Sequence, residues 1–213
     1  MPIELKGCVK TIDLGDKLIT MRVIEDLEPL LARVEVDEDI PFWAELWPSA
    51  LGLARFLWQQ IELQGKSTLE LGAGLGLPGI TAALKGAQVV ETDLVAASLE
   101  WAQVNAQLNG LFNLEYLTAD WRDFRVVGKY EVILGSDVLY EPKLHPMLEH
   151  ILEAYLLPRG RAYFADPGRE GASSFLERLT GKGWIVNTTE VTVEMDKYRN
   201  SINLYSLQRE GKG

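Results

Sequence analysis

The stretch ELGAGLGLPG, residues 70–79, decides the fold. It follows a short apolar run at 68–71 and leads into a segment where Pro78 can begin a helix, since proline suits the first helical turn. Glycines between a strand and a helix let the backbone come close to a ligand because no Cβ stands in the way. In an open α/β sheet, such a turn lies at the carboxyl ends of the strands, where ligands bind.

Strand-like and helix-like segments alternate along the chain from this turn onward. Short apolar runs predict strands at 68–71, 88–92, 114–117, 130–134 and 161–165, and longer amphipathic runs predict helices at 50–60, 78–86, 94–108, 143–157 and 170–180. Two closing runs, 184–193 and 201–208, predict an antiparallel hairpin. The alternation predicts an α/β fold with a seven-stranded, mostly parallel sheet and helices on both faces.

The chain before this pattern is expected to differ from the rest. Residues 1–40 predict a short N-terminal β extension, with a strand at 18–23 and a turn at Gly15-Asp16, which would serve the substrate side or act as a lid. Residues 41–213 would form the main domain. At its start, Ser49 is expected to cap the helix at 50–60.

Composition excludes several classes of function. The 213 residues suffice for one substantial core. A net charge of −10 without basic patches argues against a nucleic-acid partner, and no apolar run reaches the length of a membrane span. Cys8 is the single cysteine and the first residues lack a signal-peptide pattern, so a cytoplasmic location is expected. The sequence does not indicate an oligomeric state.

Histidines and cysteines give no sign of a metal centre. His145 and His150 are five residues apart on a predicted helix, so they do not share a face as a ligand pair would. We therefore expect both to be surface residues. No Cys/His cluster is present, and no metal is predicted.

Two cofactors compete for the glycine-rich turn. Gly74, Gly76 and Gly79 match the spacing of the dinucleotide fingerprint. The first glycine after the strand is Gly72, however, and counting from it Leu77 breaks that pattern. Counting from Glu70 gives acid-x-Gly-x-Gly-x-Gly, the first motif of S-adenosylmethionine methyltransferases. This register predicts contacts with that cofactor from four residues of the turn: Glu70, Gly72, Gly74 and Gly76.

Five side chains after the following strands complete the predicted site. Asp93 ends the second strand and can accept hydrogen bonds from ribose hydroxyls. Asp120 and Trp121 follow the third, where a carboxylate can bind the adenine amino group and an indole can cover the ring. Asp137 follows the fourth and, with Tyr140, is expected to line the mouth where the substrate meets the methyl group.

The chain resembles the seven-strand protein-lysine methyltransferases over about residues 41–169. The resemblance rests on 42–48 (FWAELWP), 70–79, the Asp137-x-x-Tyr140 signature and 166–169 (DPGR), and the last run points to the branch that modifies the β-subunit of electron transfer flavoprotein. It implies a class I, Rossmann-like methyltransferase fold with S-adenosyl-L-methionine as cofactor.

The same resemblance implies a role for individual residues. Trp47 would help to surround the cofactor, and Asp137 and Tyr140 would lie beside the lysine of a protein substrate. That substrate would be electron transfer flavoprotein β-subunit or a ribosomal protein. Residues 1–40 show no clear match to the family. Three alternatives stay open: a small-molecule N-methyltransferase with a lid from residues 1–45, a dinucleotide-dependent oxidoreductase, and a non-catalytic binding module.

Overall fold

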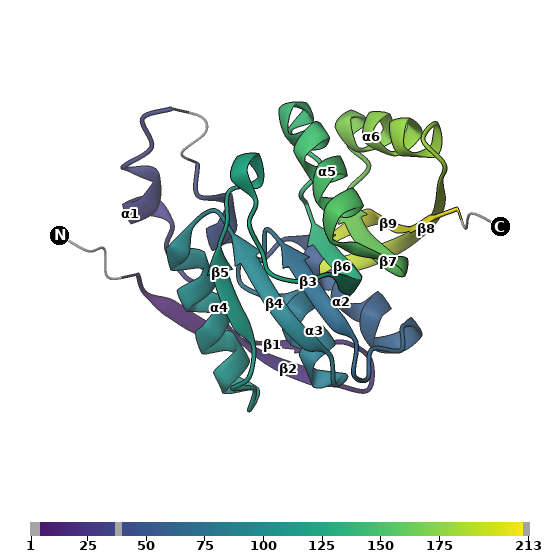
Figure 1. Ribbon diagram of the computed structural model, residues 1–213. Helices are drawn as coiled ribbons and strands as arrows, with labels where there is room; N and C mark the ends of the chain where they lie inside the picture. Colours follow the sequence, from purple (N-terminus) through teal and green to yellow (C-terminus); the bar gives the residue numbers. More distant parts are fainter. Residues whose placement is uncertain (1–4, 37–39, 211–213) are drawn as a thin grey trace.

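A seven-stranded sheet with the strand order β5-β4-β3-β6-β7-β9-β8 forms the centre of the computed structural model, which describes residues 5–36 and 40–210 (Figure 1). The strands are β3 (Ser67–Leu71), β4 (Gln88–Asp93), β5 (Glu115–Thr118), β6 (Tyr130–Ser136), β7 (Leu156–Asp166), β8 (Trp184–Met195) and β9 (Tyr198–Arg209). The first five run parallel to one another, whereas β9 runs antiparallel to both β7 and β8. The predicted sheet and its closing hairpin are therefore confirmed.

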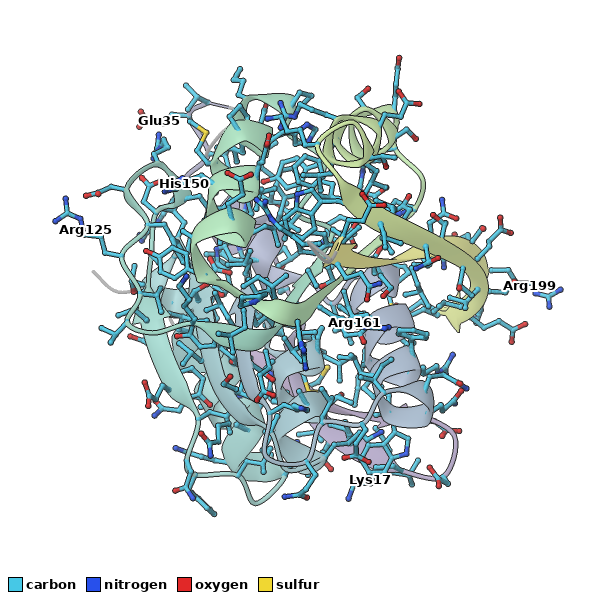
Figure 2. All side chains as sticks on the ribbon, turned by 45° about the vertical axis from the view of Figure 1, so that its right-hand side comes forward. Lys17, Glu35, Arg125, His150, Arg161 and Arg199 are labelled. Carbon is cyan, nitrogen blue, oxygen red and sulfur yellow. The ribbon has the colours of Figure 1, made fainter. Side chains whose placement is uncertain are left out.

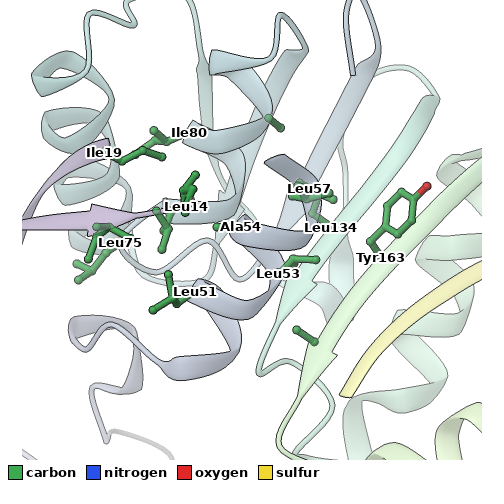
Figure 3. Packing of buried hydrophobic residues seen from close by; sticks show 14 of the residues in the cluster. Leu14, Ile19, Leu51, Leu53, Ala54, Leu57, Leu75, Ile80, Leu134 and Tyr163 are labelled. Atoms are coloured by element: carbon green, nitrogen blue, oxygen red, sulfur yellow. The ribbon is translucent and has the colours of Figure 1, made fainter. Parts of the chain in front are cut away.

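Helices cover both faces of the sheet. The five helices that pack on it are α2 (Pro48–Gln60), α3 (Leu77–Leu84), α4 (Ala96–Leu108), α5 (His145–Tyr155) and α6 (Glu170–Thr180). Two hydrophobic clusters result, one beneath α2, α3 and α4 and the other beneath α5 and α6. In the first, Leu53 and Leu57 of α2 lie fully buried against Leu134 of β6 (Figure 3). Apolar residues every four positions in α2 thus bury one face of that helix.

The N-terminal extension forms a hairpin of its own. Strands β1 (Gly7–Asp13) and β2 (Leu18–Ile24) pair antiparallel in a separate two-stranded sheet. The outer edge of β2 is bound by α4, since the side chain of Asn109 accepts from the Thr20 amide at 2.9 Å and donates to the Thr20 carbonyl at 2.7 Å. A short helix, α1 (Glu28–Leu31), follows. Residues 1–4 and 37–39 of the predicted extension lie outside the described residues.

Two local predictions are wrong. The helix predicted at 50–60 begins at Pro48 with Trp47 as its N-cap, and Ser49 makes no side-chain cap bond; it is buried instead. His145 is also buried: its Nε2 lies 3.0 Å from the Leu139 carbonyl, and its ring packs on Phe175. His150 is exposed as predicted (Figure 2). In both cases a residue near the start of a helix contacts the chain around Asp137, since Ser49 lies beside Asp137 and His145 beside Leu139.

The topology brings the functional candidates to one edge. The carboxyl ends of five parallel strands meet there, and each is followed by a residue that the sequence singled out. Chain order reverses beside β3, because β4 and β5 extend from it on one side and β6 and β7 on the other. Such a reversal leaves a crevice between the two loops that diverge from it. No helix in the described ranges has the length and apolarity to cross a bilayer.

Candidate functional site

The glycine-rich turn connects β3 to α3 at this reversal. Gly72, Gly74 and Gly76 adopt φ values of 64°, 54° and 85°, which lie in the left-handed region that favours glycine. Space is a second constraint, because a Cβ at Gly76 would lie 2.9 Å from the Cβ of Ala102. Both constraints explain why this turn needs the glycines whose spacing the sequence displays.

Asp93 holds the neighbouring loop to the turn. Its Oδ2 accepts a hydrogen bond from the Gly74 amide at 3.0 Å, and its Oδ1 accepts one from the Val95 amide at 3.0 Å. Each carboxylate oxygen can accept more than one hydrogen bond, so capacity for ribose hydroxyls remains. The structure thus places Asp93 beside the turn, where the predicted ribose contact requires it.

Glu70 lies beneath the turn rather than on its open side. Its carboxyl group is buried, and Oε2 accepts a hydrogen bond from the Gly79 amide in the first turn of α3 at 2.9 Å. Glu91, its neighbour in register on β4, is also buried. The observed role of Glu70 is therefore to fix the start of the helix, and its predicted contact with the cofactor has no support in this position.

Glu70 and Glu91 form a pair of buried acids. Burial raises the pKa of Glu70 to about 8, although the bond from Gly79 opposes the rise. Burial also raises the pKa of Glu91, and the charge of Glu70 adds to this effect. Both oxygens of Glu91 and Oε1 of Glu70 have no hydrogen-bond partner among the described residues. A buried carboxyl without a cation is stable only when protonated, so at least one of the two carries a proton near neutrality.

Asp120 and Trp121 lie on the other flank of the turn. The Trp121 ring is close to it, since a Cβ on Gly72 would lie 3.6 Å from Trp121 Cζ2. Asp120 forms an ion pair with Arg122 at 2.6 Å, and the hydrogen bonds from Arg122 lower the pKa of its carboxyl. The position of Trp121 fits the predicted cover for an adenine ring, whereas both oxygens of the Asp120 carboxylate already accept hydrogen bonds from Arg122.

An aromatic group lies above the turn on the segment before α2. Phe42 is the centre of this group: its ring centroid is 6.3 Å from that of Trp47 and 5.9 Å from that of Tyr140. The Trp47 indole donates a hydrogen bond to the Phe42 carbonyl at 2.8 Å. The same segment crosses the turn closely, because a Cβ on Gly74 would lie 3.4 Å from the Trp43 carbonyl oxygen. Two distant predicted residues, Trp47 and Tyr140, thus meet through Phe42.

Asp137 directly follows β6 and faces a cation. Its Oδ1 accepts a hydrogen bond from Arg169 Nη1 at 2.6 Å, and that nitrogen lies 2.9 Å from Asp166 Oδ2. Burial raises the pKa of Asp137, and the hydrogen bond and charge of Arg169 oppose the rise. Val138 packs on the turn, since a Cβ on Gly72 would lie 3.0 Å from its Cγ1. Asp137 therefore lies at the edge of the glycine-rich turn, as predicted.

Three residues of this site were missed by reasoning from the sequence. Arg169 belongs to a run that the sequence singled out, but nothing in the run shows that its side chain reaches back to Asp137. Ser49 was assigned to a helix cap, yet its contact with Asp137 contributes to lowering the pKa of that carboxyl. Glu91 could have been noticed as an acid in the apolar strand VVET.

Comparison with known proteins now identifies the family. The sequence profile of a family described as "Lysine methyltransferase" matches residues 29–182 of this chain, well over half of its length. The chain belongs to this family. Its membership confirms the predicted family and, with it, S-adenosylmethionine as the cofactor, and it removes the oxidoreductase alternative.

The curated relatives of this family member act on different side chains. They include EEF1A lysine methyltransferase 3 of Mus musculus, 36% identical over 64% of the chain and 61% of the relative. Histone-arginine methyltransferase METTL23 of Mus musculus is 38% identical over 46% of the chain and 42% of its own length. Electron transfer flavoprotein beta subunit lysine methyltransferase of Mus musculus is 33% identical over 61% of the chain and 51% of its own length. The chain thus spans about half of these relatives.

Solved structures share the fold. A ribosomal protein L11 methylase from Lactobacillus delbrueckii subsp. bulgaricus superimposes with a TM-score of 0.64, covering 94% of this chain and 99% of that one, at 19% sequence identity. This likeness, together with the strand order, confirms the predicted class I methyltransferase fold.

Proposed function

We propose that this family member transfers a methyl group from S-adenosylmethionine to a lysine side chain of a protein. The observation that carries the proposal is the position of Asp137. Its carboxylate lies beside the glycine-rich turn, Oδ1 is bound by Arg169, and Oδ2 is buried without a hydrogen-bond partner among the described residues. An amine nitrogen that donates to Oδ2 would satisfy this acceptor at the place where the turn presents the cofactor.

The residues around the turn suit the proposed cofactor. The left-handed glycines Gly72 and Gly74 leave the backbone accessible, Asp93 offers acceptors for hydroxyl groups, and Trp121 offers a ring face. When bound, S-adenosylmethionine supplies a methyl group on a positively charged sulfur, and its displacement by a nitrogen leaves a neutral thioether. The protein has therefore mainly to orient the nitrogen and to exclude water.

Asp137 would orient the nitrogen, and the aromatic group would exclude water. A lysine amine has an ordinary pKa of about 10.4, so fewer than about one in a thousand is neutral near pH 7. Oδ2 of Asp137 can bind the ammonium, aim it, and receive the proton that the nitrogen loses. Tyr140 and Phe42 lie beside this path and reduce its hydration, which favours the neutral amine. Tyr140 itself is 48% exposed, so a side chain arriving from outside can contact it.

A protein fits the surroundings better than a metabolite does. A hollow of about 590 Å³ lies beside the aromatic segment, between the N-terminal hairpin, α2 and the β8–β9 turn. Acidic residues outnumber basic ones in its lining, with Asp13, Glu25, Glu45, Glu194 and Asp196 against Lys10 and Arg55. Such a surface suits a basic segment around the target lysine.

The substrate itself is proposed from the relatives. Two of them carry names that specify elongation factor 1A and electron transfer flavoprotein β-subunit as proteins whose lysines are modified. We propose the β-subunit first and a ribosomal protein second, with the reaction in the cytosol. The N-terminal hairpin, which borders the hollow, would serve the substrate side. The net charge of −10 disfavours a nucleic acid in its place.

Labelling a lysate with tritiated S-adenosylmethionine tests the proposal. Macromolecules are separated from metabolites, and the protein fraction is hydrolysed to amino acids. Counts in methyl-lysine support the proposal. Counts in methyl-arginine or methyl-histidine would contradict the acceptor, counts confined to small molecules would favour the metabolite enzyme, and counts in nuclease-sensitive material would contradict both. Asp123→Asn, an exposed aspartate beside Arg125, is the matched control for Asp137→Asn in this assay.

A further inference from the structure

Three charged side chains meet where β6 and β7 end. One guanidinium nitrogen, Arg169 Nη1, lies 2.6 Å from Asp137 Oδ1 and 2.9 Å from Asp166 Oδ2. The three side chains therefore carry a formal net charge of −1. A single nitrogen that binds two carboxylates fixes the distance between them, because charge-assisted hydrogen bonds are short and strong.

Asp166 anchors this arrangement. Its side chain is fully buried, and Oδ1 accepts hydrogen bonds from the Gly168 and Arg169 amides at 2.7 Å each. The third bond, from Arg169 Nη1 to Oδ2, provides the cation that a buried carboxylate requires. Asp166 thus holds both the backbone and the side chain of Arg169, and it has no access to a ligand of its own.

Asp137 is held more loosely and under strain. It is a non-glycine residue with φ of 55°, a conformation that costs on the order of 1–3 kcal/mol and is found mainly at functional sites. Its amide donates to the Ala165 carbonyl at 2.9 Å, which ties the strained residue to β7. Its side chain keeps 13% exposure, compared with none for Asp166. Only Asp137 can therefore meet both Arg169 and a ligand.

We propose that Arg169 is a positioning residue of the acceptor site, which binds Oδ1 of Asp137 and leaves Oδ2 as the oxygen for the acceptor nitrogen. The proposal rests on the proposed methyl transfer. The geometry gives Arg169 a second effect, because its charge offsets that of Asp137. A free carboxylate would stabilise the ammonium form of a lysine, whereas a neutralised one stabilises it less. Arg169 thus lowers the pH at which the acceptor becomes nucleophilic.

Variants of Arg169 separate positioning from a structural role. Arg169→Gln keeps a hydrogen-bond donor without the charge, and Arg169→Lys keeps the charge without the planar fork. Arg125→Gln is the matched control, because Arg125 forms an exposed ion pair with Asp123 at 2.8 Å and projects into solvent (Figure 2). Thermal unfolding and calorimetry with S-adenosylhomocysteine show whether each variant keeps the fold and the cofactor site.

The deciding measurements are two titrations. Carbon-13 NMR of the aspartate carboxyls should show the pKa of Asp137 about one unit higher in Arg169→Gln, since an opposite charge is lost. Methyl transfer from tritiated S-adenosylmethionine to lysate protein should fall by about tenfold or more at pH 7.5 and recover toward higher pH, because the ascending limb of the pH–rate profile moves to higher pH. Arg169→Lys should restore part of the rate, and Arg125→Gln should match the wild type.

Other results would overturn the proposal. An unchanged Asp137 titration and pH profile in Arg169→Gln would show that Arg169 does not act on Asp137. A loss of S-adenosylhomocysteine binding together with a lower unfolding temperature would show a structural role. A wild-type protein that binds S-adenosylhomocysteine but labels no protein would contradict the proposed function instead, and the Asp137 titration would still decide whether Arg169 controls that carboxyl.

Discussion

The two halves of the site use carboxylates in opposite ways. In the half built by β3 and β4, Glu70 and Asp93 accept hydrogen bonds from backbone amides, and no basic side chain among the described residues pairs with them. In the half built by β6 and β7, Asp137 and Asp166 share the guanidinium of Arg169. A carboxylate at or near the carboxyl end of a strand is therefore bound either by backbone amides or by a basic side chain, and the two halves differ in which of these it is.

The difference matches the two tasks of a methyltransferase. The cofactor half fixes the conformation of a turn and needs no mobile proton, so its acids can be buried. In the proposed reaction, the acceptor half binds a cationic amine that then loses a proton, and this requires a carboxylate that is not fully enclosed by the protein. Asp137 is the acid of the acceptor half that meets this requirement, since its side chain keeps 13% exposure whereas that of Asp166 is fully buried.

The largest expected effect is on the acceptor half alone. Asp137→Asn should reduce methyl transfer by about 100-fold or more, because an amide can neither bind the ammonium by charge nor receive its proton. Affinity for S-adenosylhomocysteine should stay close to that of the wild type by calorimetry. Asp123→Asn should leave both quantities unchanged. Methyl transfer at the wild-type rate by Asp137→Asn would show that Asp137 has no role in the reaction and that the two halves do not differ as proposed.

A variant of the cofactor half should instead lose affinity for the cofactor. Asp93→Ala should weaken S-adenosylmethionine binding by about 1.5–3 kcal/mol, the range for a hydrogen bond that involves a charged group. Asp93→Asn, which keeps one acceptor oxygen, should lose less. Calorimetry with NAD in parallel provides the negative control. Full cofactor affinity in Asp93→Ala would remove this residue from the binding site.

Packing beneath the turn can be probed without touching the ligand. A Cβ on Gly79 would lie 2.4 Å from Glu70 Oε2 and 2.5 Å from Glu91 Oε1. Gly79→Ala should therefore lower the free energy of unfolding by about 1–3 kcal/mol, as overpacking does, even though alanine favours a helix. Gly181→Ala is the control, since the nearest atom to its Cβ would be 3.6 Å away. Equal stability of the two variants would show that the side chains of Glu70 and Glu91 can move to make room for the added Cβ at little cost.

The last test of the cofactor half concerns the protons on the buried pair of acids. Because the folded chain raises the pKa of Glu70 to about 8 from 4.5, the stabilisation is complete below pH 4.5 and is lost as the pH rises toward 8. The free energy of unfolding should fall by about 1.4 kcal/mol per pH unit for each proton involved. Urea unfolding between pH 5 and pH 8 measures this slope.

Glu91→Gln should make that slope shallower by the contribution of Glu91, since an amide of the same shape needs no proton, whereas buried Glu70 keeps its own contribution. The exposed Glu190→Gln, on β8, should leave the slope of the wild type unchanged. A slope in Glu91→Gln equal to that of the wild type would show that the proton of Glu91 does not contribute to the pH dependence.

Much of the fold follows from local pattern. The alternation of apolar strands and amphipathic helices predicted all seven strands of the main sheet, and the boundary errors are small except at β7, which begins at Leu156 instead of 161. Those added residues include Pro158, Arg159 and Gly160, which do not resemble a strand. Pairing of Tyr130 with Leu156, followed by a shift of register, extends the strand there.

The candidate site was predicted in its positions rather than in its contacts. Parallel strands must end at one edge, so Gly72, Asp93, Trp121 and Asp137 could be brought together from the order of elements alone. The side-chain partners could not. Whether an acid at a strand end meets a backbone amide, another acid or an arginine depends on how loops distant in sequence cross each other.

The sequence by itself thus determined the class of fold, the glycine-rich turn and the family, because backbone conformation and periodic burial are local properties. The tertiary structure decided the chemistry of each carboxylate. It buried Glu70 against Glu91 across two strands, folded His145 into the interior, and brought Arg169 to Asp137 from 32 residues away. Charge interactions depend on distance and on exclusion of water, and both are fixed only when the whole chain has packed.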